Sequence, residues 1–292
     1  MTHPSSPSWS AYWRLARFDK PVGTLLLLWP TAWGLWLAAQ GFPDPPRLIV
    51  FLLGVVLMRA AGCVLNDLAD RRFDGAVQRT VQRVLAQGEL SVQQAARFAL
   101  FLLLPSAGLL YFLTPLAIAM ACLAVVTAAA YPFFKRFFPV PQAVLGVAFG
   151  FGIPMAFADT LHSIPPLAWV LWLANGLWVL AYDTAYAMVD RDDDVQLSLK
   201  SSAITFGSWD WTAVALAQTA FLLLMLAVPM MAPVGSLYLL SWLIAVVLSW
   251  RLLSRLRSRS REDCFWVFRQ SHWVGAVLWV GMATDLAVQA LF

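Results

Sequence analysis

The chain has 292 residues, of which 61% are hydrophobic and only 12% are charged, and its mean hydropathy is +0.71. A soluble domain carries about 25% charged residues, so this composition excludes an ordinary soluble protein and indicates a polytopic α-helical membrane protein. The net charge of +4 does not indicate nucleic-acid binding, because the basic residues are scattered among short segments between apolar runs.

Apolar runs long enough to cross a bilayer as helices begin near residue 22. The preceding segment, MTHPSSPSWSAYW, lacks the basic and apolar pattern of a cleaved signal peptide, so we expect the first run to direct membrane insertion. Nine runs are predicted to be transmembrane helices: about 22–39, 48–66, 93–112, 115–134, 141–158, 166–187, 211–231, 236–253 and 271–291.

Lysine and arginine are divided unequally between the two ends of these runs. Of the 20 basic residues, 18 fall on the side of the N-terminus, Arg47 falls on the other side, and Arg59 lies inside the second run. Because cytoplasmic loops are enriched in basic residues, we expect a cytoplasmic N-terminus and, with nine helices, a C-terminus on the opposite side. The chain is predicted to form one domain, 1–292, with two long cytoplasmic loops at about 67–92 and 188–210.

The first acidic cluster, within CVLNDLADRRFDG, lies where the second apolar run ends. Each residue of an α-helix turns by about 100°, so Asn66, Asp70 and Asp74 fall within about 80° of one another on a helix. Asp67 lies about 100° from Asn66. All four side chains are therefore predicted to share one helix face.

The second acidic cluster, within AYDTAYAMVDRDDDVQ, overlaps the end of the sixth run. Asp183, Asp190 and Asp194 form a stripe about 40° wide on a helix. Asp192 and Asp193 point away from this stripe, and we expect them to be solvated.

Carboxylates aligned in this way repel one another unless cations lie beside them. Hard divalent cations such as Mg²⁺ bind carboxylate oxygens and share the phosphate oxygens of a substrate. Two such clusters at one membrane surface predict a diphosphate held between Mg²⁺ ions. The alternative, ordinary interfacial acids at helix ends, would suffice for one aspartate but not for six aspartates confined to two arcs.

Basic side chains near the clusters could clamp a departing diphosphate, or they could serve only to anchor the topology. Arg59 lies about two turns inside the membrane from Asn66, where an ionised group is costly and is usually functional. It could pair with an aspartate of the first cluster or bind an anionic group of a substrate. The other basic candidates are Arg71 or Arg72, Arg79, Arg83, Lys135, Arg136 and Lys200.

Together these features indicate ionisation of an allylic diphosphate, with aromatic rings to stabilise the carbocation. A membrane location suits a substrate with a long hydrocarbon tail, since each CH₂ costs about 0.8 kcal/mol to move into water. The competing class is a cation-coupled transporter, whose sites lie near the bilayer midplane on broken helices. The clusters lie at cytoplasmic helix ends, which favours the enzyme.

Five segments resemble a known family. NDLADRRFD is similar to the first motif, N-D-x-x-D-x-x-x-D, of the UbiA superfamily of intramembrane prenyltransferases. DTAYAMVDRDDD followed by LKSSAITFG resembles the second motif as it occurs in the 4-hydroxybenzoate polyprenyltransferase branch. RFDKPVGTLLLLWPTAWGLW and YPFFKRFFPVPQAVLGVAFG resemble further segments of that branch, so the similarity extends from about residue 14 to residue 210.

The resemblance implies nine helices around a central cavity, in a bacterial inner membrane with the active site facing the cytoplasm. It implies Mg²⁺-dependent transfer of a polyprenyl group from polyprenyl diphosphate to the ring carbon ortho to the hydroxyl of 4-hydroxybenzoate, a step of ubiquinone biosynthesis. By this resemblance one side of the Mg²⁺–diphosphate is held by Asn66, Asp70 and Asp74, the other side is held by Asp190 and Asp194, and both sides are supported by Asp67 and Asp183. The resemblance also implies that the diphosphate is contacted by Arg72, Arg79 and Lys200. It implies that Arg136 contacts the hydroxybenzoate carboxylate.

One position departs from the family pattern. The family usually has R-P-L after the first motif, whereas QRVLAQG places Val84 where proline is expected. Proline would fix the backbone of that loop, so its absence puts the rigidity of the loop in question. Related family members act on naphthoate, homogentisate or haem, and Arg136 favours a benzoate without excluding these acceptors.

Overall fold

The computed structural model describes residues 8–71 and 74–291, and every regular element within them is a helix. Proline stands at the first turn of α3, α5, α6 and α8, where its missing N–H has no helical partner to lose. The helices are α1 (Trp9–Leu15), α2 (Val22–Ala39), α3 (Pro45–Asp70), η1 (Asp74–Ala76), α4 (Val92–Leu109), η2 (Leu110–Phe112), α5 (Pro115–Phe134), α6 (Pro141–Gly150), α7 (Gly152–Leu161), α8 (Pro166–Gln196), α9 (Ser202–Phe206), η3 (Gly207–Trp209), α10 (Asp210–Leu226), η4 (Val228–Met230), α11 (Ser236–Leu256), α12 (Arg261–Gln270) and α13 (His272–Gln289).

Seven segments of the described chain are long and apolar enough to cross a membrane, and they coincide with seven of the nine predicted runs. The other two predicted runs correspond to α8 and α13, which have 31 and 18 residues. Polar side chains such as Asn175 and Asp285 lower the hydropathy of these two helices, and both residues are buried inside the protein. The seven segments are 22–39, 45–70, 92–112, 115–134, 141–161, 202–230 and 236–256.

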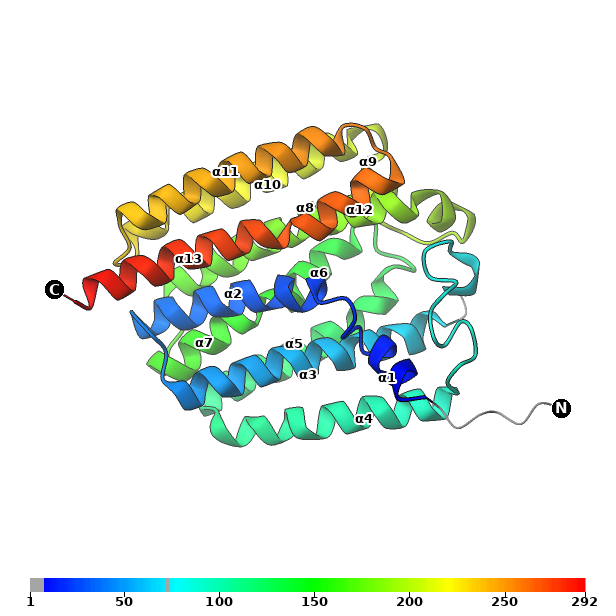
Figure 1. Ribbon diagram of the computed structural model, residues 1–292, viewed down its shortest axis with the longest axis horizontal. Coiled ribbons are helices and arrows are strands. Elements are labelled where there is room, and N and C mark those ends of the chain that lie inside the picture. Colours follow the sequence, from blue (N-terminus) through cyan, green and yellow to red (C-terminus); the bar gives the residue numbers. More distant parts are fainter. Residues whose placement is uncertain (1–7, 72–73, 292) are drawn as a thin grey trace.

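The long helices lie side by side, with α10 and α11 along one edge of the bundle and α4 along the other (Figure 1). The interior helix is α8, which packs against α6, α7, α9, α10 and α12. Its Trp178 is fully buried and lies 5.5 Å from Trp33 of α2 and 5.7 Å from Phe221 of α10, measured between ring centroids. These aromatic rings fix three helices around the centre of the bundle.

A close helix contact brings α6 against α8. A Cβ atom at Gly146 would lie 2.9 Å from the carbonyl oxygen of Gly176, which is closer than real Cβ contacts. Gly146 therefore allows the two backbones to approach directly, as small residues do in membrane helix pairs.

The cap segment, residues 74–91, lies at the end of the bundle that also carries α1 and α12 (Figure 1, cyan). It consists of turns after the short η1 helix, and Val84 and Leu90 bury its underside in an apolar cluster with α1, α3 and α4. Val84 is 1% exposed, and its carbonyl oxygen accepts a hydrogen bond from the N–H of Glu89 at 3.0 Å. Burial of Val84 therefore holds the loop at the position where the family pattern has proline.

The two acidic segments differ from the expected helix boundaries. The α3 helix ends at Asp70 and Asp74 lies in η1, so the common helix face predicted for Asn66, Asp70 and Asp74 does not extend to Asp74. By contrast α8 continues to Gln196, well into the 188–210 segment expected to be a loop, so Asp190 and Asp194 are both helical. The first motif is thus a helix end plus a turn, and the second is one continuous helix.

Two buried aspartates stabilise the opposite end of the bundle. Asp159 of α7 accepts from Arg47 Nε at 2.6 Å and from the N–H of Thr114 at 2.8 Å, which joins α3, α5 and α7. Asp285 of α13 accepts from the N–H groups of Gly235 and Tyr238, both at 2.7 Å, and so caps the start of α11. Asp285, for which the sequence suggested no role, is a helix cap.

Candidate active site

A cavity of about 970 Å³ opens where α3, α5 and α8 end, between these helices and the cap segment. It receives residues from both acidic clusters, which are more than 100 positions apart in the chain. Of the predicted site residues, Arg72 lies outside the described residues and Arg136 does not line the cavity. The predicted residues that do line it are Asn66, Asp67, Asp70, Asp74, Arg79, Asp183, Asp190, Asp194 and Lys200.

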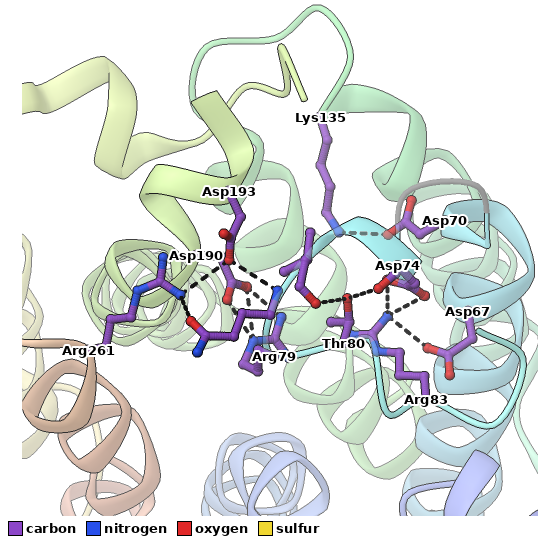
Figure 2. A network of polar contacts seen from close by, with 12 residues as sticks. Asp67, Asp70, Asp74, Arg79, Thr80, Arg83, Lys135, Asp190, Asp193 and Arg261 are labelled. Atoms are coloured by element: carbon purple, nitrogen blue, oxygen red, sulfur yellow. Dashed lines mark hydrogen bonds and ion pairs between the residues drawn. The ribbon is translucent and has the colours of Figure 1, made fainter. Parts of the chain in front are cut away.

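Arginines neutralise the first acidic cluster (Figure 2). Arg83 Nη1 lies 2.8 Å and 2.9 Å from the two carboxylate oxygens of Asp74 and 3.1 Å from Asp67 Oδ1. Asp67 also accepts from Arg17 Nη2, at 2.9 Å and 2.8 Å. Burial raises the pKa of Asp74, and the Arg83 guanidinium opposes that rise. Asp67 is paired with both Arg17 and Arg83. In this conformation its carboxylate balances the charge of the two arginines and is not free to bind a metal ion.

The second acidic cluster is paired with the cap segment. Arg79 Nε donates to the two oxygens of Asp190 at 2.9 Å and 3.0 Å. The Arg79 guanidinium lies 4.4 Å from the centre of the Tyr186 ring, which stacks on Phe268 of α12 at 4.1 Å. A cation–π contact and an ion pair together fix Arg79 across the cavity from α3.

A lysine at the end of α5 bonds to the last residue of α3. Lys135 Nζ donates to Asp70 Oδ2 at 3.1 Å and lies 5.4 Å from the centre of the Tyr131 ring. The carbonyl oxygen of Lys135 accepts from the N–H of Lys200 at 2.7 Å, which brings the segment after α8 to the same rim. Of the two adjacent basic residues Lys135 and Arg136, it is therefore Lys135 that faces the carboxylates.

Asp193 corrects one expectation. Its Oδ2 accepts from the N–H of Gln78 and from Arg261 Nη1, both at 3.3 Å, and Arg261 also donates to Gln78 Oε1 at 2.7 Å. The prediction of a solvated Asp193 is wrong because the cap segment and α12 fold over this face of α8 (Figure 2). Asp192, by contrast, is 77% exposed.

The oxygen donors suit a hard divalent cation, but most are engaged by basic side chains. Within the described residues, no three acidic, histidine or cysteine side chains converge closely enough to hold an ion as they stand. Asp194 has no hydrogen-bond or ion-pair partner among the described side chains, and burial together with the nearby Asp190 raises its pKa to about 7. A cation beside Asp194 would relieve both effects. The donor set therefore fits Mg²⁺ once Asp70, Asp74 and Asp190 share their basic partners with a phosphate group.

Arg59 and Tyr182 form a second polar region deeper in the cavity wall. In the described structure Arg59 makes no ion pair, and its buried Nε has no hydrogen-bond partner. The Tyr182 hydroxyl on α8 is likewise buried without a partner. Gly23 makes room for the guanidinium, since a Cβ atom there would lie 2.2 Å from Arg59 Nη2. The sequence suggested that Arg59 either pairs with an aspartate or binds an anionic group of a substrate. Within the described residues it does not pair with an aspartate, so an unpaired cation faces the cavity.

Arg136 occupies a different environment. Its guanidinium lies over the ring of Phe133 at 5.1 Å, and both side chains are exposed. Phe133 lines the cavity, but Arg136 does not. The structure thus does not bring Arg136 to the acidic residues. Sequence reasoning missed Tyr182 because a tyrosine near a helix end is usually an interfacial anchor.

Comparison with known proteins identifies the family. The model of the UbiA prenyltransferase family matches residues 27–276. A 4-hydroxybenzoate octaprenyltransferase of Aeromonas hydrophila is 49% identical over 275 residues, covering 94% of this chain and 96% of the relative. A protein of the same name from Ralstonia nicotianae is 47% identical and covers 98% of both chains.

Solved structures share the fold. The apo structure of a UbiA homolog from Aeropyrum pernix K1 has a TM-score of 0.79 at 24% identity and covers 90% of this chain and 97% of that one. A UbiA homolog from Archaeoglobus fulgidus, bound to GPP and Mg²⁺, has a TM-score of 0.68 at 18% identity and covers 92% and 99%. The chain is an integral membrane protein that belongs to the UbiA prenyltransferase family.

Proposed function

We propose that this protein transfers a polyprenyl group from polyprenyl diphosphate to 4-hydroxybenzoate, at the ring carbon ortho to the hydroxyl, in the pathway to ubiquinone. The single observation that carries this proposal is one cavity that joins both acidic motifs, a set of basic side chains and an apolar wall. The near-full-length identity of 47–49% to 4-hydroxybenzoate octaprenyltransferases supports the same acceptor.

The diphosphate end of the donor is assigned to the rim of the cavity. Asp70 and Asp74 on one side and Asp190 and Asp194 on the other supply oxygen ligands for Mg²⁺, with Asn66 beside them. Bound Mg²⁺ supplies positive charge that stabilises the leaving diphosphate. Basic N–H groups add to this by donating to the diphosphate oxygens as the carbon–oxygen bond breaks and its electron pair moves to oxygen. These donors are Arg79, Arg83, Lys135 and Lys200.

The prenyl tail is assigned to the apolar wall formed by α4, α5 and α6. Leu103, Ala128, Leu145 and Phe149 line this part of the cavity. Val125 of α5 lines it too and is 46% exposed on the surface of the bundle. The cavity therefore reaches the apolar outer surface, so a long tail can remain in contact with lipid while its head lies at the polar rim.

The acceptor is assigned to the region of Arg59 and Tyr182. Arg59 is half-buried and its buried Nε has no partner, which is unfavourable, and a benzoate carboxylate would satisfy it with charge-assisted hydrogen bonds. This assignment replaces the prediction that Arg136 binds the carboxylate, since Arg136 lies outside the cavity. Held there, the ring carbon ortho to the hydroxyl bonds to the allylic cation and then loses its proton to restore aromaticity. The ring of Tyr131 lines the same cavity and stabilises that cation.

The topology follows from the distribution of charge and polarity. We infer nine membrane-crossing helices, the seven apolar segments together with α8 and α13, whose polar residues are satisfied or enclosed inside the bundle. The basic residues gather at the cavity end, so that end, with the N-terminus, faces the cytoplasm and the C-terminus lies on the other side. The bacterial relatives favour the inner membrane.

An assay of the purified protein tests the function. Labelled 4-hydroxybenzoate, a polyprenyl diphosphate and Mg²⁺ are expected to give a labelled lipid-soluble product, and a chelator is expected to abolish it. A panel of aromatic acceptors in place of 4-hydroxybenzoate measures specificity. Absence of a lipid-soluble product under every condition, or product only from a different acceptor, would contradict the proposal.

A further inference from the structure

We propose that Arg17, in the turn after α1, is a positioning residue for the diphosphate site. It acts through a chain of alternating charges that runs from Arg17 to Asp67, from Asp67 to Arg83 and from Arg83 to Asp74. Arg17 begins the RFDKPVG segment, whose role the acidic motifs do not explain. The inference rests on the proposed function of Arg83 and Asp74 at the diphosphate.

The geometry of the chain is continuous. Arg17 Nη2 contacts both oxygens of Asp67, at 2.8 Å and 2.9 Å, and Asp67 Oδ1 lies 3.1 Å from Arg83 Nη1. The same Arg83 nitrogen contacts both oxygens of Asp74, at 2.8 Å and 2.9 Å. The position of Arg83 is therefore set by two carboxylates that pull it in different directions.

Asp67 needs both of its cations. Its side chain is only 2% exposed, and a buried carboxylate with too few partners is strongly unfavourable. If Arg17 were absent, Arg83 would be the remaining cation beside Asp67. We expect its guanidinium to move toward Asp67 and away from Asp74, which would displace a diphosphate donor and an oxygen ligand together.

The backbone conformation at Arg17 helps to hold its side chain against Asp67. Its φ is +60°, a left-handed conformation that non-glycine residues rarely adopt. The N–H of Phe18 donates to the carbonyl oxygen of Trp13 at 3.2 Å, and Arg17 Nη1 donates to the carbonyl oxygen of Arg14 at 3.0 Å. A conformation of this kind persists when its surroundings over-determine it. Here the turn and Asp67 together hold the guanidinium.

The test measures binding of inorganic diphosphate with Mg²⁺ to the purified full-length protein by calorimetry, without turnover. Arg17→Ala is expected to weaken binding about 10-fold, in the range found when a residue behind a ligand is removed. Arg17→Lys, with one charge but no fork, is expected to be intermediate. Glu89→Gln is the matched control: it removes the Arg14–Glu89 ion pair, which also joins the N-terminal segment to the cap but does not reach Asp67. It is expected to bind within about twofold of wild type.

A double-mutant cycle separates positioning from direct contact. Because Arg17 acts through Asp67, Arg17→Ala is expected to change affinity by less than about twofold when Asp67→Asn is already present. The same 10-fold loss in both backgrounds would mean that Arg17 touches the diphosphate itself, and would overturn the inference. A lower melting temperature with unchanged affinity in Arg17→Ala would also overturn it, since that is a purely structural role. Failure of the wild type to bind magnesium diphosphate would instead reject the proposed diphosphate site.

Discussion

The two ends of the bundle both carry buried aspartates, but they use them differently. At the end with Arg47, Asp159 is enclosed and accepts from one arginine and one backbone N–H, and Asp285 accepts from two backbone N–H groups. At the cavity end the carboxylates face an open space and are held by long side chains of opposite charge.

This difference separates structural from functional acids. A carboxylate saturated by backbone N–H groups cannot exchange partners without unfolding a helix end. A carboxylate held by arginine or lysine can exchange, because the long basic side chain can turn toward a phosphate. On this basis we propose ligand binding for Asp70, Asp74 and Asp190, and a structural role for Asp285 and for Asp159, which does not line the cavity.

The largest effect is expected from a carboxylate of the cavity. Asp190→Asn removes a charge that would hold Mg²⁺ and leaves Arg79 without its partner, so kcat/KM is expected to fall by about 10³-fold. Asp70→Asn is expected to behave similarly. Steady-state assays with saturating 4-hydroxybenzoate measure the loss. Asp159→Asn is the control at the other end and should retain normal kinetic constants. Equal losses of kcat/KM in Asp190→Asn and Asp159→Asn would show that the aspartates at the two ends do not differ in function.

The next effect concerns the acceptor. Arg59→Gln removes a cavity guanidinium that makes no ion pair with the described residues, and KM for 4-hydroxybenzoate is expected to rise about 100-fold, since losing one partner of a buried charge pair costs about 2–5 kcal/mol. KM for the polyprenyl diphosphate should stay nearly constant. Arg136→Gln serves as the comparison and should change KM by less than about threefold, since its side chain is exposed. If KM for 4-hydroxybenzoate rose more in Arg136→Gln than in Arg59→Gln, the carboxylate would be bound by Arg136 instead.

A smaller effect is expected from crowding Arg59 without removing it. In Gly23→Ala the new methyl group would lie 2.2 Å from Arg59 Nη2, so the guanidinium must shift. We expect KM for 4-hydroxybenzoate to rise about 10-fold, part of the loss in Arg59→Gln. Gly108→Ala on α4, which does not line the cavity, meets nothing within 4 Å and should leave KM unchanged. Identical kinetics for the two alanine variants would show that the position of Arg59 does not matter.

The smallest effect on activity is expected from Arg47. Arg47→Ala leaves Asp159 buried without its cation, which should lower the free energy of unfolding by about 3 kcal/mol while kcat and KM stay unchanged. Thermal unfolding in detergent and the standard assay measure the two quantities. A change of KM without loss of stability would place a functional group at this end of the bundle.

Much of this arrangement is predictable from sequence because it depends on local patterns. The apolar runs predicted seven of the membrane segments, since length and hydropathy decide them. The spacing of Asp190 and Asp194 on a helix is correct because α8 continues through them. The acids of both motifs line one cavity, as expected from their position at one membrane surface.

The features that the sequence did not predict depend on contacts between segments that are far apart in the chain. Asp74 leaves the helix, so helical spacing cannot place it, and Asp193 is covered by α12, which lies about 70 positions later. Arg136 and Lys135 are adjacent in sequence, and only the end of α5 decides which of them faces Asp70. No sequence pattern links Arg17 to Asp67, which are 50 positions apart.

A structure with Mn²⁺ and a non-hydrolysable prenyl diphosphate analogue tests the central claim most directly. Manganese gives an anomalous signal that locates the ion independently of the protein. We predict ions that contact at least one carboxylate of the first motif, Asp70 or Asp74, and at least one of the second, Asp190 or Asp194, with the diphosphate between them. Manganese bound away from these residues, or held by one motif alone, would contradict the account.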